Sequence, residues 1–346
     1  MYTRERSEQP AVSVIVVSHN ARPLLRDCLL SVKAAQGPRH FEVVVADNAS
    51  SDGSLEMCRD EFPDVQTIEN HENLGFGMAN NQGIRASRAE LVLLLNSDTV
   101  VSAESVNRLI EQILCRPGVG VLGCRAIRPD GSEQPSCFNF PSLKTAIVER
   151  LLLYGLSRKL PHTVMEYHAT DGPFECDWVL GACMLVRRAA LEAVGGFDES
   201  IWMYGEEMDL CYRIKAAGWK IMFDPHAEII HLGGGSWGKR ACSPTVLKVL
   251  GLLYFFVKYR SWGIASLVRI LIAAGAILRI FVWMTALVGK RDERKSIFGE
   301  LRANLLILRS GVGLRKSVTA GRGHFLNAKL TRRRPPDSSA SLRPWV

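Results

Sequence analysis

The chain has 346 residues, of which 47% are hydrophobic and 23% charged, and its formal net charge is +8. This length and apolar content predict one large domain or two ordinary ones. The nine cysteines are odd in number and no two have C-x-x-C spacing. That argues against a disulfide framework and a zinc site, and it favours a reducing compartment. Residues 1–10 are a polar tail in which we expect no secretory signal.

The positive charge is concentrated at the C-terminus. From residue 290 onward there are 14 Lys and Arg against 4 Asp and Glu, a balance of +10 that leaves about −2 for the rest of the chain. The basic tail, residues 291–346, predicts an anionic surface as partner, either a membrane or a nucleic acid. Because the tail lacks interleaved aromatic residues, we expect no nucleic-acid partner. Its last dozen residues favour a solvated, disordered end.

Short apolar runs alternate with helical patterns from residue 11 onward. The strands are expected at residues 12–17, 41–46, 65–68 and 91–95. Helical spacing follows at residues 24–32 and again at about 78–87, and the polar loop 47–54 leads into a further helix. Strand–helix alternation of this kind predicts an α/β fold with a mostly parallel central sheet.

Polar clusters follow three of these strands, at residues 18–20, 47–54 and 96–98. Ligands of parallel α/β sheets bind outside the carboxyl ends of the strands, so the three clusters predict a binding crevice. No G-x-G-x-x-G motif follows the first strand and no G-x-x-x-x-G-K-[ST] motif occurs. Both a dinucleotide-binding fold and a P-loop are therefore disfavoured.

Two residues are candidate metal ligands. Asp98 ends the third polar cluster and suits a hard divalent cation, Mg²⁺ or Mn²⁺, that bridges it to a diphosphate; it equally fits a helix cap. His231 ends the strand-like residues 227–230 and precedes the glycine-rich residues 232–236, where the backbone can approach phosphate closely. The pattern leaves open whether His231 binds metal or phosphate, or is structural.

Three carboxylates lie within four residues, at Glu206, Glu207 and Asp209, where a loop leads into an amphipathic helix that ends near Gly218. The positive end of a helix dipole tolerates negative charge, and an acid held there beside apolar walls suits a general base. The alternative is that these acids only cap the helix.

Residues 241–290 are dominated by apolar side chains, and residues 263–289 are long enough to span a bilayer. Arg269 and Arg279 interrupt that segment, and each is costly at a bilayer centre. A helix that spans the membrane is therefore the less favoured interpretation.

Charges recur at intervals of 10 or 11 residues in this region, at Lys258, Arg269, Arg279 and Lys290. In one continuous helix they form a single basic stripe, because three turns are about 11 residues. This predicts a helix in the membrane interface with its charges toward anionic head groups and with interfacial tryptophans. A soluble helix pair that covers the α/β domain is the alternative.

Taken together, the motifs of residues 11–237 resemble the inverting family-two glycosyltransferases, and within them the rhamnosyltransferase-like branch. They occur in order at residues 14–20, 45–54, 73–83, 95–98, 181–188, 196–199, 206–209 and 231–236. The resemblance implies a GT-A catalytic domain over residues 11–240, and the apolar residues 241–290 that follow are the membrane-associating helical region predicted above. It also implies a divalent metal, a nucleotide-diphosphate sugar donor and a role in cell-surface polysaccharide or glycolipid assembly.

The resemblance also implies roles for individual residues. The donor-binding residues are Ser18, Asn20, Asp47, Asn48, Asn73, Gly75, Phe76, Asn81 and Asn96, with Asp47 at the nucleoside. The metal ligands are Asp98 and His231, and the acceptor-binding residues are Gly181, Ala182 and Trp202. The tripeptide 96–98 stands in the place of the family's D-x-D motif, with Asn96 instead of the first Asp.

Glu207 matches the second acid of the family's acidic pair, the catalytic base, where the family usually has Asp. If Glu207 does not reach, Glu206 or Asp209 becomes the base. The base takes a proton from an acceptor hydroxyl, which attacks the anomeric carbon in line with the leaving diphosphate and inverts it. We expect dTDP-rhamnose as donor and a saccharide as acceptor, with a polyprenyl-diphosphate-linked saccharide as the candidate, at the cytoplasmic face of the cell membrane.

Two other functions stay open on the residues. Asn96 and Glu207 depart from the family pattern. These departures leave open a second function, a membrane-associated nucleotide-sugar-binding protein without catalytic activity, which would bind donor without turnover. A nucleotidyltransferase shares the sheet architecture but needs a glycine-rich loop with Arg or Lys after the first strand. Residues 18–20 do not supply that loop.

Overall fold

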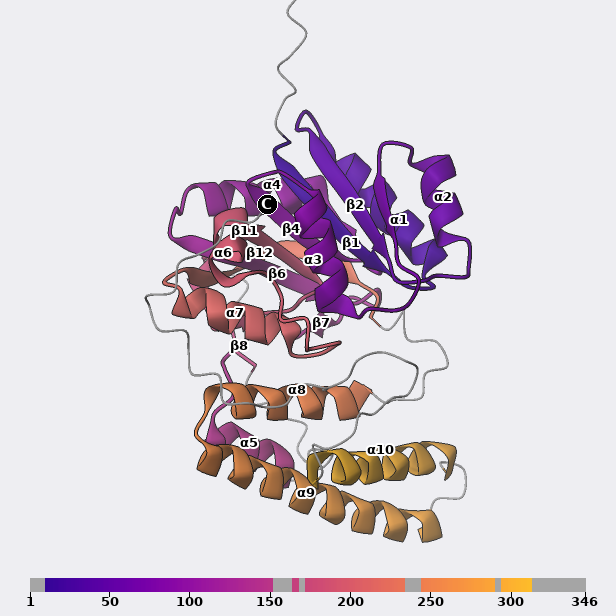
Figure 1. Cartoon of the computed structure of the whole chain (residues 1–346), viewed down its shortest axis with the longest axis vertical. Helices are drawn as coiled ribbons and strands as arrows, with labels where there is room; N and C mark the ends of the chain where they lie inside the picture. The colour runs from indigo at the N-terminus through magenta and orange to yellow at the C-terminus, as the bar shows by residue number, and fades with distance from the viewer. Residues whose placement is uncertain (1–9, 152–163, 168–171, 234–243, 290–293, 313–346) are drawn as a thin grey trace, which may run out of the picture.

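The structure is a computed structural model that describes residues 10–151, 164–167, 172–233, 244–289 and 294–312. Two parts lie one above the other in Figure 1. The upper part, here called the α/β body, is a sheet covered by helices, and the lower part, here called the helical layer, consists of α5, α8, α9 and α10.

A ten-stranded mixed sheet forms the centre of the α/β body, in the order β3-β2-β1-β4-β11-β6-β12-β5, with β7 and β9 attached beside it. The first four neighbours are parallel: β3 (Gln66–Glu69), β2 (Phe41–Asp47), β1 (Val12–Ser18) and β4 (Leu91–Asn96). The remaining strands of the path are β11 (Cys183–Arg187), β6 (Val119–Ile127), β12 (Lys220–His231) and β5 (Thr99–Val101). The attached strands are β7 (Glu133–Gln134) and β9 (Phe174–Glu175), and a separate small sheet pairs β8 (Cys137–Phe138) with β10 (Trp178–Val179).

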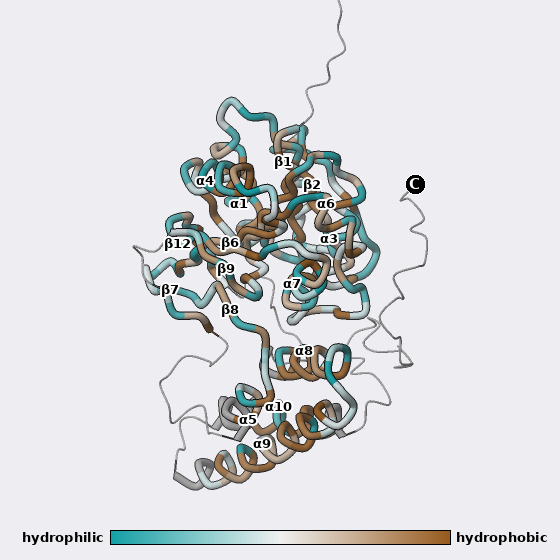
Figure 2. The backbone as a smooth tube through the Cα atoms, turned by 90° about the vertical axis from the view of Figure 1, so that its left-hand side faces the viewer, coloured by the Kyte–Doolittle hydropathy of each residue, from teal (hydrophilic) through white to brown (hydrophobic). Residues whose placement is uncertain are grey.

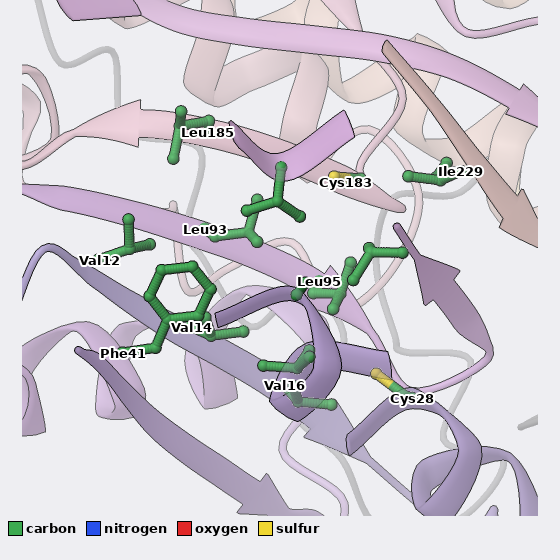
Figure 3. Close-up of a cluster of buried hydrophobic side chains, with 14 of the residues drawn as sticks. Val12, Val14, Val16, Cys28, Phe41, Leu93, Leu95, Cys183, Leu185 and Ile229 are labelled. Carbon is green, nitrogen blue, oxygen red and sulfur yellow. The ribbon is translucent and has the colours of Figure 1, made fainter. Parts of the chain in front are cut away.

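Helices cover both faces of this sheet because side chains alternate along the buried strands. In β1, Val14 and Val16 belong to a core shared with Leu25 of α1, whereas Ile15 belongs to a second core on the opposite face, shared with Leu210 of α7. Figure 3 shows the first core, where side chains from β1, β4 and β11 meet. The helices of the body are α1 (Arg22–Gln36), α2 (Ser54–Glu61), α3 (Phe76–Ala86), α4 (Ala103–Leu114), α6 (Arg188–Val194) and α7 (Glu206–Ala216).

The predicted α/β fold with a mostly parallel sheet is confirmed, and the predicted strands lie within a residue of those observed. The third helix, α3, begins at Phe76, two residues earlier than expected, because Gly75 makes the preceding turn at φ 88°. The strand predicted at residues 227–230 is the end of the longer β12, whose pairing with β6 is interrupted between Asp224 and Glu228.

The helical layer has its own hydrophobic cluster. Its helices are α5 (Leu143–Leu151), α8 (Pro244–Tyr259), α9 (Trp262–Gly289) and α10 (Arg294–Val312). Buried side chains of all four helices meet in this cluster, including Ala146, Phe256, Ile272 and Ile307. Figure 2 shows how strongly hydrophobic α8 and α9 are. Because α5 comes from the middle of the α/β body, the layer is not one contiguous segment of the chain.

The prediction of one continuous basic stripe is wrong. α8 ends at Tyr259 and α9 begins at Trp262, so Lys258 and Arg269 lie on different helices. Ser261 causes the break: its side chain accepts the backbone N–H of Ile264 at 3.5 Å, as an N-cap residue does. Lys290 lies outside the described residues.

The two arginines of α9 lie on its inner side rather than toward head groups. Arg279 donates a hydrogen bond to Asn304 of α10, whose side chain is buried, and the Nε atom of Arg269 is buried as well. Part of the basic tail is also folded, because residues 294–312 form α10 and pack against α9 through Ala303 and Ile307.

Candidate active site

A cavity of about 600 Å³ is lined by residues at the carboxyl ends of the strands and by residues of α8 in the helical layer. The cavity is lined from segments far apart in the sequence: Ser18 and His19 at the end of β1, Asn96 and Asp98 at the end of β4, Glu206 and Glu207 of α7, His231 of β12, and Lys248 and Leu252 of α8. The strand register explains the gathering, because β1 pairs Ser18 with Asp47 of β2 and Val17 with Asn96 of β4. Polar residues that end these strands therefore share one edge.

The structure divides the sequence-predicted site residues into two groups. Those that line the cavity are Ser18, Asn48, Asn73, Phe76, Asn96, Asp98, Gly181, Ala182, Glu206, Glu207 and His231. Those that lie beside or behind its wall are Asn20, Asp47, Gly75, Asn81, Trp202 and Asp209.

Two buried polar groups stand at the ends of β1 and β2. Asp47 is fully buried; its Oδ1 atom accepts the backbone N–H of Ser50 at 2.8 Å. Its Oδ2 atom and the hydroxyl of Ser18 have no hydrogen-bond partner within the described part of the chain. Burial raises the pKa of Asp47 above its usual value. Buried unpaired oxygens are rare, so this corner of the site suits a ligand that donates hydrogen bonds.

Backbone strain is concentrated around the cavity. The non-glycine residues with positive φ in the described ranges are Asn20 at 49°, Ala49 at 61° and Tyr204 at 67°. Tyr204 lines the cavity, and Asn20 and Ala49 each directly follow a residue that does. Such conformations cost on the order of 1–3 kcal/mol each and cluster at functional sites, where surrounding contacts hold them.

Trp202, Gly75 and Asn81 hold the wall in place. Any side chain at Gly75 would clash with Trp202, whose indole N–H donates to the carbonyl oxygen of Asn73 at 3.1 Å. Asn81 donates to the carbonyl oxygen of Phe197 and accepts its backbone N–H, which ties α3 to the loop before α7. These residues position the site from outside the cavity.

Asp98 and His231 form a close pair. The His231 Nε2 atom lies 3.2 Å from Asp98 Oδ1, and its Nδ1 atom lies 2.9 Å from Gln134 Oε1. The antiparallel pairing of β12 with β5 places His231 opposite Thr99 and causes this approach. A carboxylate and an imidazole suit Mn²⁺ or Mg²⁺ as a partial ligand set. Within the described ranges no group of three or more such side chains gathers, so a ligand and water would complete the coordination.

The acids Glu206 and Glu207 lie side by side at the N-terminus of α7. Glu206 is 4% exposed, and its Oε2 atom has no hydrogen-bond partner among the described residues. Burial, followed by repulsion from Glu207, raises the pKa of Glu206 well above its usual value. Burial also raises the pKa of Glu207, although the backbone N–H of Gly205, 3.3 Å away, and the charge of Lys248 oppose this. Glu206 thus favours the protonated form, and Glu207 is the better placed base.

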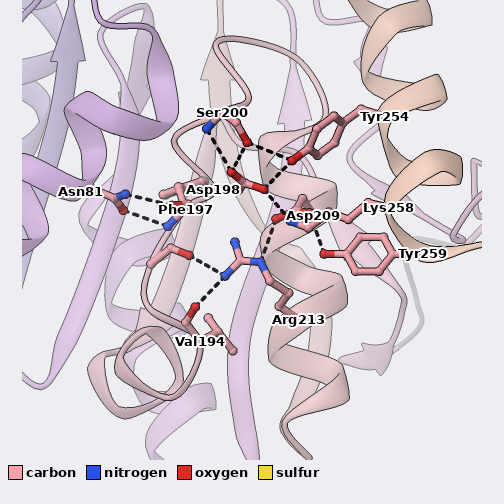
Figure 4. Close-up of polar contacts among 11 residues, drawn as sticks. Asn81, Val194, Phe197, Asp198, Ser200, Asp209, Arg213, Tyr254, Lys258 and Tyr259 are labelled. Carbon is pink, nitrogen blue, oxygen red and sulfur yellow. Dashed lines mark hydrogen bonds and ion pairs between the residues drawn. The ribbon is translucent and has the colours of Figure 1, made fainter. Parts of the chain in front are cut away.

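Asp209 is engaged elsewhere. One of its oxygens accepts from Lys258 at 2.6 Å and Tyr259 at 2.7 Å, and the other accepts from Arg213 at 2.8 Å (Figure 4). With a side chain 2% exposed and outside the cavity wall, Asp209 does not suit the role of base. Sequence reasoning missed Lys248, whose only signal was that it is a charge in the otherwise apolar run of α8. Lys258 was expected to face lipid head groups, but it binds Asp198 and Asp209 instead.

Comparison with known proteins agrees with this geometry. The profile of glycosyl transferase family 2 matches residues 13–171. An N-acetylglucosaminyl-diphospho-decaprenol L-rhamnosyltransferase of Mycobacterium tuberculosis is 33% identical over 244 residues, which cover 66% of this chain and 78% of that protein. The rhamnosyltransferase WbbL of Escherichia coli is 27% identical over 229 residues, which cover 64% of this chain and 83% of that protein.

A solved structure supports the fold. The mannosyltransferase PcManGT of Pyrobaculum calidifontis, in complex with GDP-Man and Mn²⁺, matches with a TM-score of 0.51 at 18% identity, over 90% of this chain and 89% of that one. At that identity the likeness shows the fold alone, which is of the GT-A type. The strand-end cavity, the family profile and the 33% identical relative together show that the chain belongs to glycosyl transferase family 2.

Proposed function

We propose that the protein transfers a sugar, with inversion, from a nucleotide-diphosphate donor to an acceptor hydroxyl. One observation carries the proposal: a single cavity is lined by a carboxylate–imidazole pair, Asp98 and His231, and by an acid pair, Glu206 and Glu207. Sugar transfer needs both parts, one for the charge of the leaving diphosphate and one to take up the proton of the acceptor.

Asp98 and His231 would hold the divalent metal, Mg²⁺ or Mn²⁺, and their oxygen and nitrogen donors fit it. When bound, that metal supplies Lewis-acid stabilisation of charge on the diphosphate. Gln134 would fix the orientation of the His231 ring through Nδ1, as hydrogen-bond partners of metal-binding histidines do. Ser18 lines the cavity and offers its unpaired hydroxyl to the nucleoside, whereas Asp47, which was predicted to contact the nucleoside, lies behind the wall.

Glu207 accepts the proton of the acceptor hydroxyl. The oxygen then bonds to the anomeric carbon on the face opposite the diphosphate, the bond from that carbon to the diphosphate breaks, and the configuration inverts. A base of this kind contributes roughly 10²–10⁴ in rate. Glu206, held protonated by burial, keeps the pair from carrying two adjacent negative charges.

The relatives indicate the substrate class. Two of them are rhamnosyltransferases, and the name of one includes a diphospho-decaprenol. We therefore propose dTDP-rhamnose as the donor and a polyprenyl-diphosphate-linked saccharide as the acceptor, in the assembly of a cell-surface glycan.

We propose that the helical layer attaches the protein to the cytoplasmic face of the membrane. Such attachment would bring the cavity close to a lipid-linked acceptor. One helix of the described part, over Trp262–Thr285, is long and apolar enough to cross a bilayer, and 28% of its most apolar window is buried. The outward face of α9 carries exposed apolar side chains, including Ile270 at 64% and Phe281 at 67% exposure, while its arginines lie inward.

This arrangement supports a helix that lies along the membrane rather than across it. α10 packs along α9 and carries charged side chains such as Arg302, so α9 would have to take those charges into the bilayer core in order to span it. At 1.5 Å per residue the 28 residues of α9 extend about 42 Å, longer than the roughly 30 Å core. An interfacial position immerses only the apolar face.

A screen of nucleotide sugars tests the proposal. Purified protein is incubated with each donor, with Mg²⁺, Mn²⁺ or EDTA and with a polyprenyl-diphosphate-linked saccharide, and product and anomeric configuration are read by mass spectrometry and NMR. We expect metal-dependent transfer from one donor with inversion. Saturable donor binding without turnover would instead assign the protein as a binding protein, and retention of configuration would overturn the mechanism.

A further inference from the structure

Helix α8 forms one wall of the cavity, although it belongs to the helical layer. Lys248 and Leu252 line the cavity together with both acids of the pair. The Lys248 Nζ atom lies 5.3 Å from the centre of the Tyr204 ring, and Tyr204 stands in the strained loop just before α7. The side chain of Lys248 is thus held beside the loop that leads into the acid pair.

The position of Lys248 is fixed by two contacts further along the same face of α8. Gly251 packs so closely on the backbone of Tyr204 and Gly205 that no side chain would fit there. Seven residues later, Lys258 bridges Asp198, 2.5 Å away, and Asp209, 2.6 Å away (Figure 4). Because residues three, four or seven apart share a helix face, these contacts fix the position of Lys248 along α8 relative to α7.

Helices α7 and α8 place charges beside the acid pair, and other segments add Arg128, Asp98, His19 and His231 to the same cavity wall. On α7, Asp209 is neutralised by Arg213 and Lys258, and Cys211 is a buried thiol whose pKa burial raises to about 12, so it is uncharged at neutral pH. On α8, Lys248 acts on Glu207 with the opposite sign. The acid pair therefore faces a cation that comes from the helical layer.

We propose that Lys248 is an electrostatic partner of the active site, which keeps Glu207 ionised while Glu206 retains the proton. The inference rests on the proposed function and deepens it, because it makes the helical layer a part of the catalytic centre. Without Lys248 the pair would face the cavity with no neighbouring cation from α8, and Glu207 would hold its proton to higher pH.

The pH profile of transfer tests this role. In Lys248→Met we expect the acid limb of kcat/KM to move to higher pH by about 0.5–1 unit, since an opposite charge nearby lowers a carboxyl pKa but solvent screens the charge of this exposed lysine. Lys248→Arg keeps the charge and should restore the wild-type limb. Lys144→Met, an exposed lysine of α5 with no place in the cavity wall, is the matched control and should leave the profile unchanged.

A second readout does not depend on turnover. Carbodiimide modifies protonated carboxyls, so peptide mapping across a pH series reports the protonation of Glu207 directly. We expect the pH midpoint for Glu207 to rise in Lys248→Met and to stay in place in Lys144→Met. An unchanged midpoint overturns the inference whether or not the protein transfers sugar. A raised midpoint in a protein without transferase activity retains the electrostatic role and rejects the proposed function instead.

Discussion

The two acids of the site differ in their surroundings although they are adjacent in the sequence. Both line the cavity, but Glu206 is buried with one oxygen unpaired, whereas Glu207 is less buried and accepts a backbone N–H. A pair whose environments push the two pKa values apart is the usual arrangement for acid–base chemistry at neutral pH. The raised pKa of Glu206 also predicts that this residue lowers the free energy of unfolding at pH 7, because a carboxyl that must stay protonated there opposes folding.

Glu206→Gln should therefore stabilise the protein in a pH-dependent way. The folded-state pKa of Glu206 is raised above the unfolded value, so the stability cost of Glu206 is absent below about pH 4 and grows as the pH rises. We expect the Tm of the variant to exceed that of wild type by about 2–4 °C at pH 7 and to match it at pH 4. Glu192→Gln, an exposed acid on α6, is the control. A gain of equal size at both pH values would contradict the assignment.

At the scale of elements, the contact between α7 and α8 joins the two parts of the molecule. Lys258 connects the loop residue Asp198 with Asp209 of α7, and Tyr254 donates to Asp198 as well. Burial alone would raise the pKa of Asp198, but the hydrogen bonds and charge of Lys258, with Ser200 and Tyr254, outweigh it and lower that pKa strongly. The network is therefore ionic at neutral pH.

Lys258→Met should destabilise the fold, because it leaves the buried carboxylate of Asp209 with one charge partner fewer. We expect a loss of about 1–3 kcal/mol in the free energy of unfolding, measured by urea titration at pH 7. Lys215→Met is the matched control: Lys215 also contacts two carboxylates, Asp177 and Glu175, but these are far more exposed than Asp209. We expect the control to lose less than about 1 kcal/mol. Equal losses in the two variants would refute the stabilising role of the contacts that Lys258 makes.

For the whole molecule, the outward face of α9 is a feature that the packing of the α/β body does not explain. Ile270 and Ile277 are 64% and 58% exposed, so changing both to Gln removes apolar area without disturbing the packed core. We expect this double variant to lose at least about tenfold in partitioning to anionic vesicles, measured by co-sedimentation. Leu30→Gln with Leu114→Gln, exposed residues of the α/β body, should leave partitioning unchanged.

Two results would reject this membrane surface. One is equal partitioning of both double variants. The other is a wild-type dimer that the α9 changes convert to monomer without any effect on vesicle binding, which would assign the face to contact between two copies of the chain.

Much of the α/β body could be predicted from the sequence, for a physical reason. The runs of β-branched residues in β1 and β2 are strands buried on both faces, and polar residues that end parallel strands must share an edge. The helical layer was harder. Hydropathy marks α8 and α9 as apolar but does not say which side chains another helix covers, so the inward direction of Arg279 and the break at Ser261 were missed.

The same limit applies to the site. The motifs placed Asp98, Glu207 and His231 among its residues, and the structure gathers them in one cavity. Lys248 belongs to no motif of the family pattern and lies 41 residues beyond Glu207 in the sequence, so only the docking of α8 on α7 reveals that it faces the acid pair.

The most direct test of the central claim is the transfer rate of Glu207→Gln with dTDP-rhamnose, a polyprenyl-diphosphate-linked saccharide and Mn²⁺. Glu192→Gln is measured in parallel as the control for loss of a carboxylate. We predict that kcat falls by about 10²–10⁴ in Glu207→Gln, with donor binding retained, and that the control behaves as wild type. Transfer by Glu207→Gln at the wild-type rate would contradict the claim that this cavity performs base-assisted sugar transfer through Glu207.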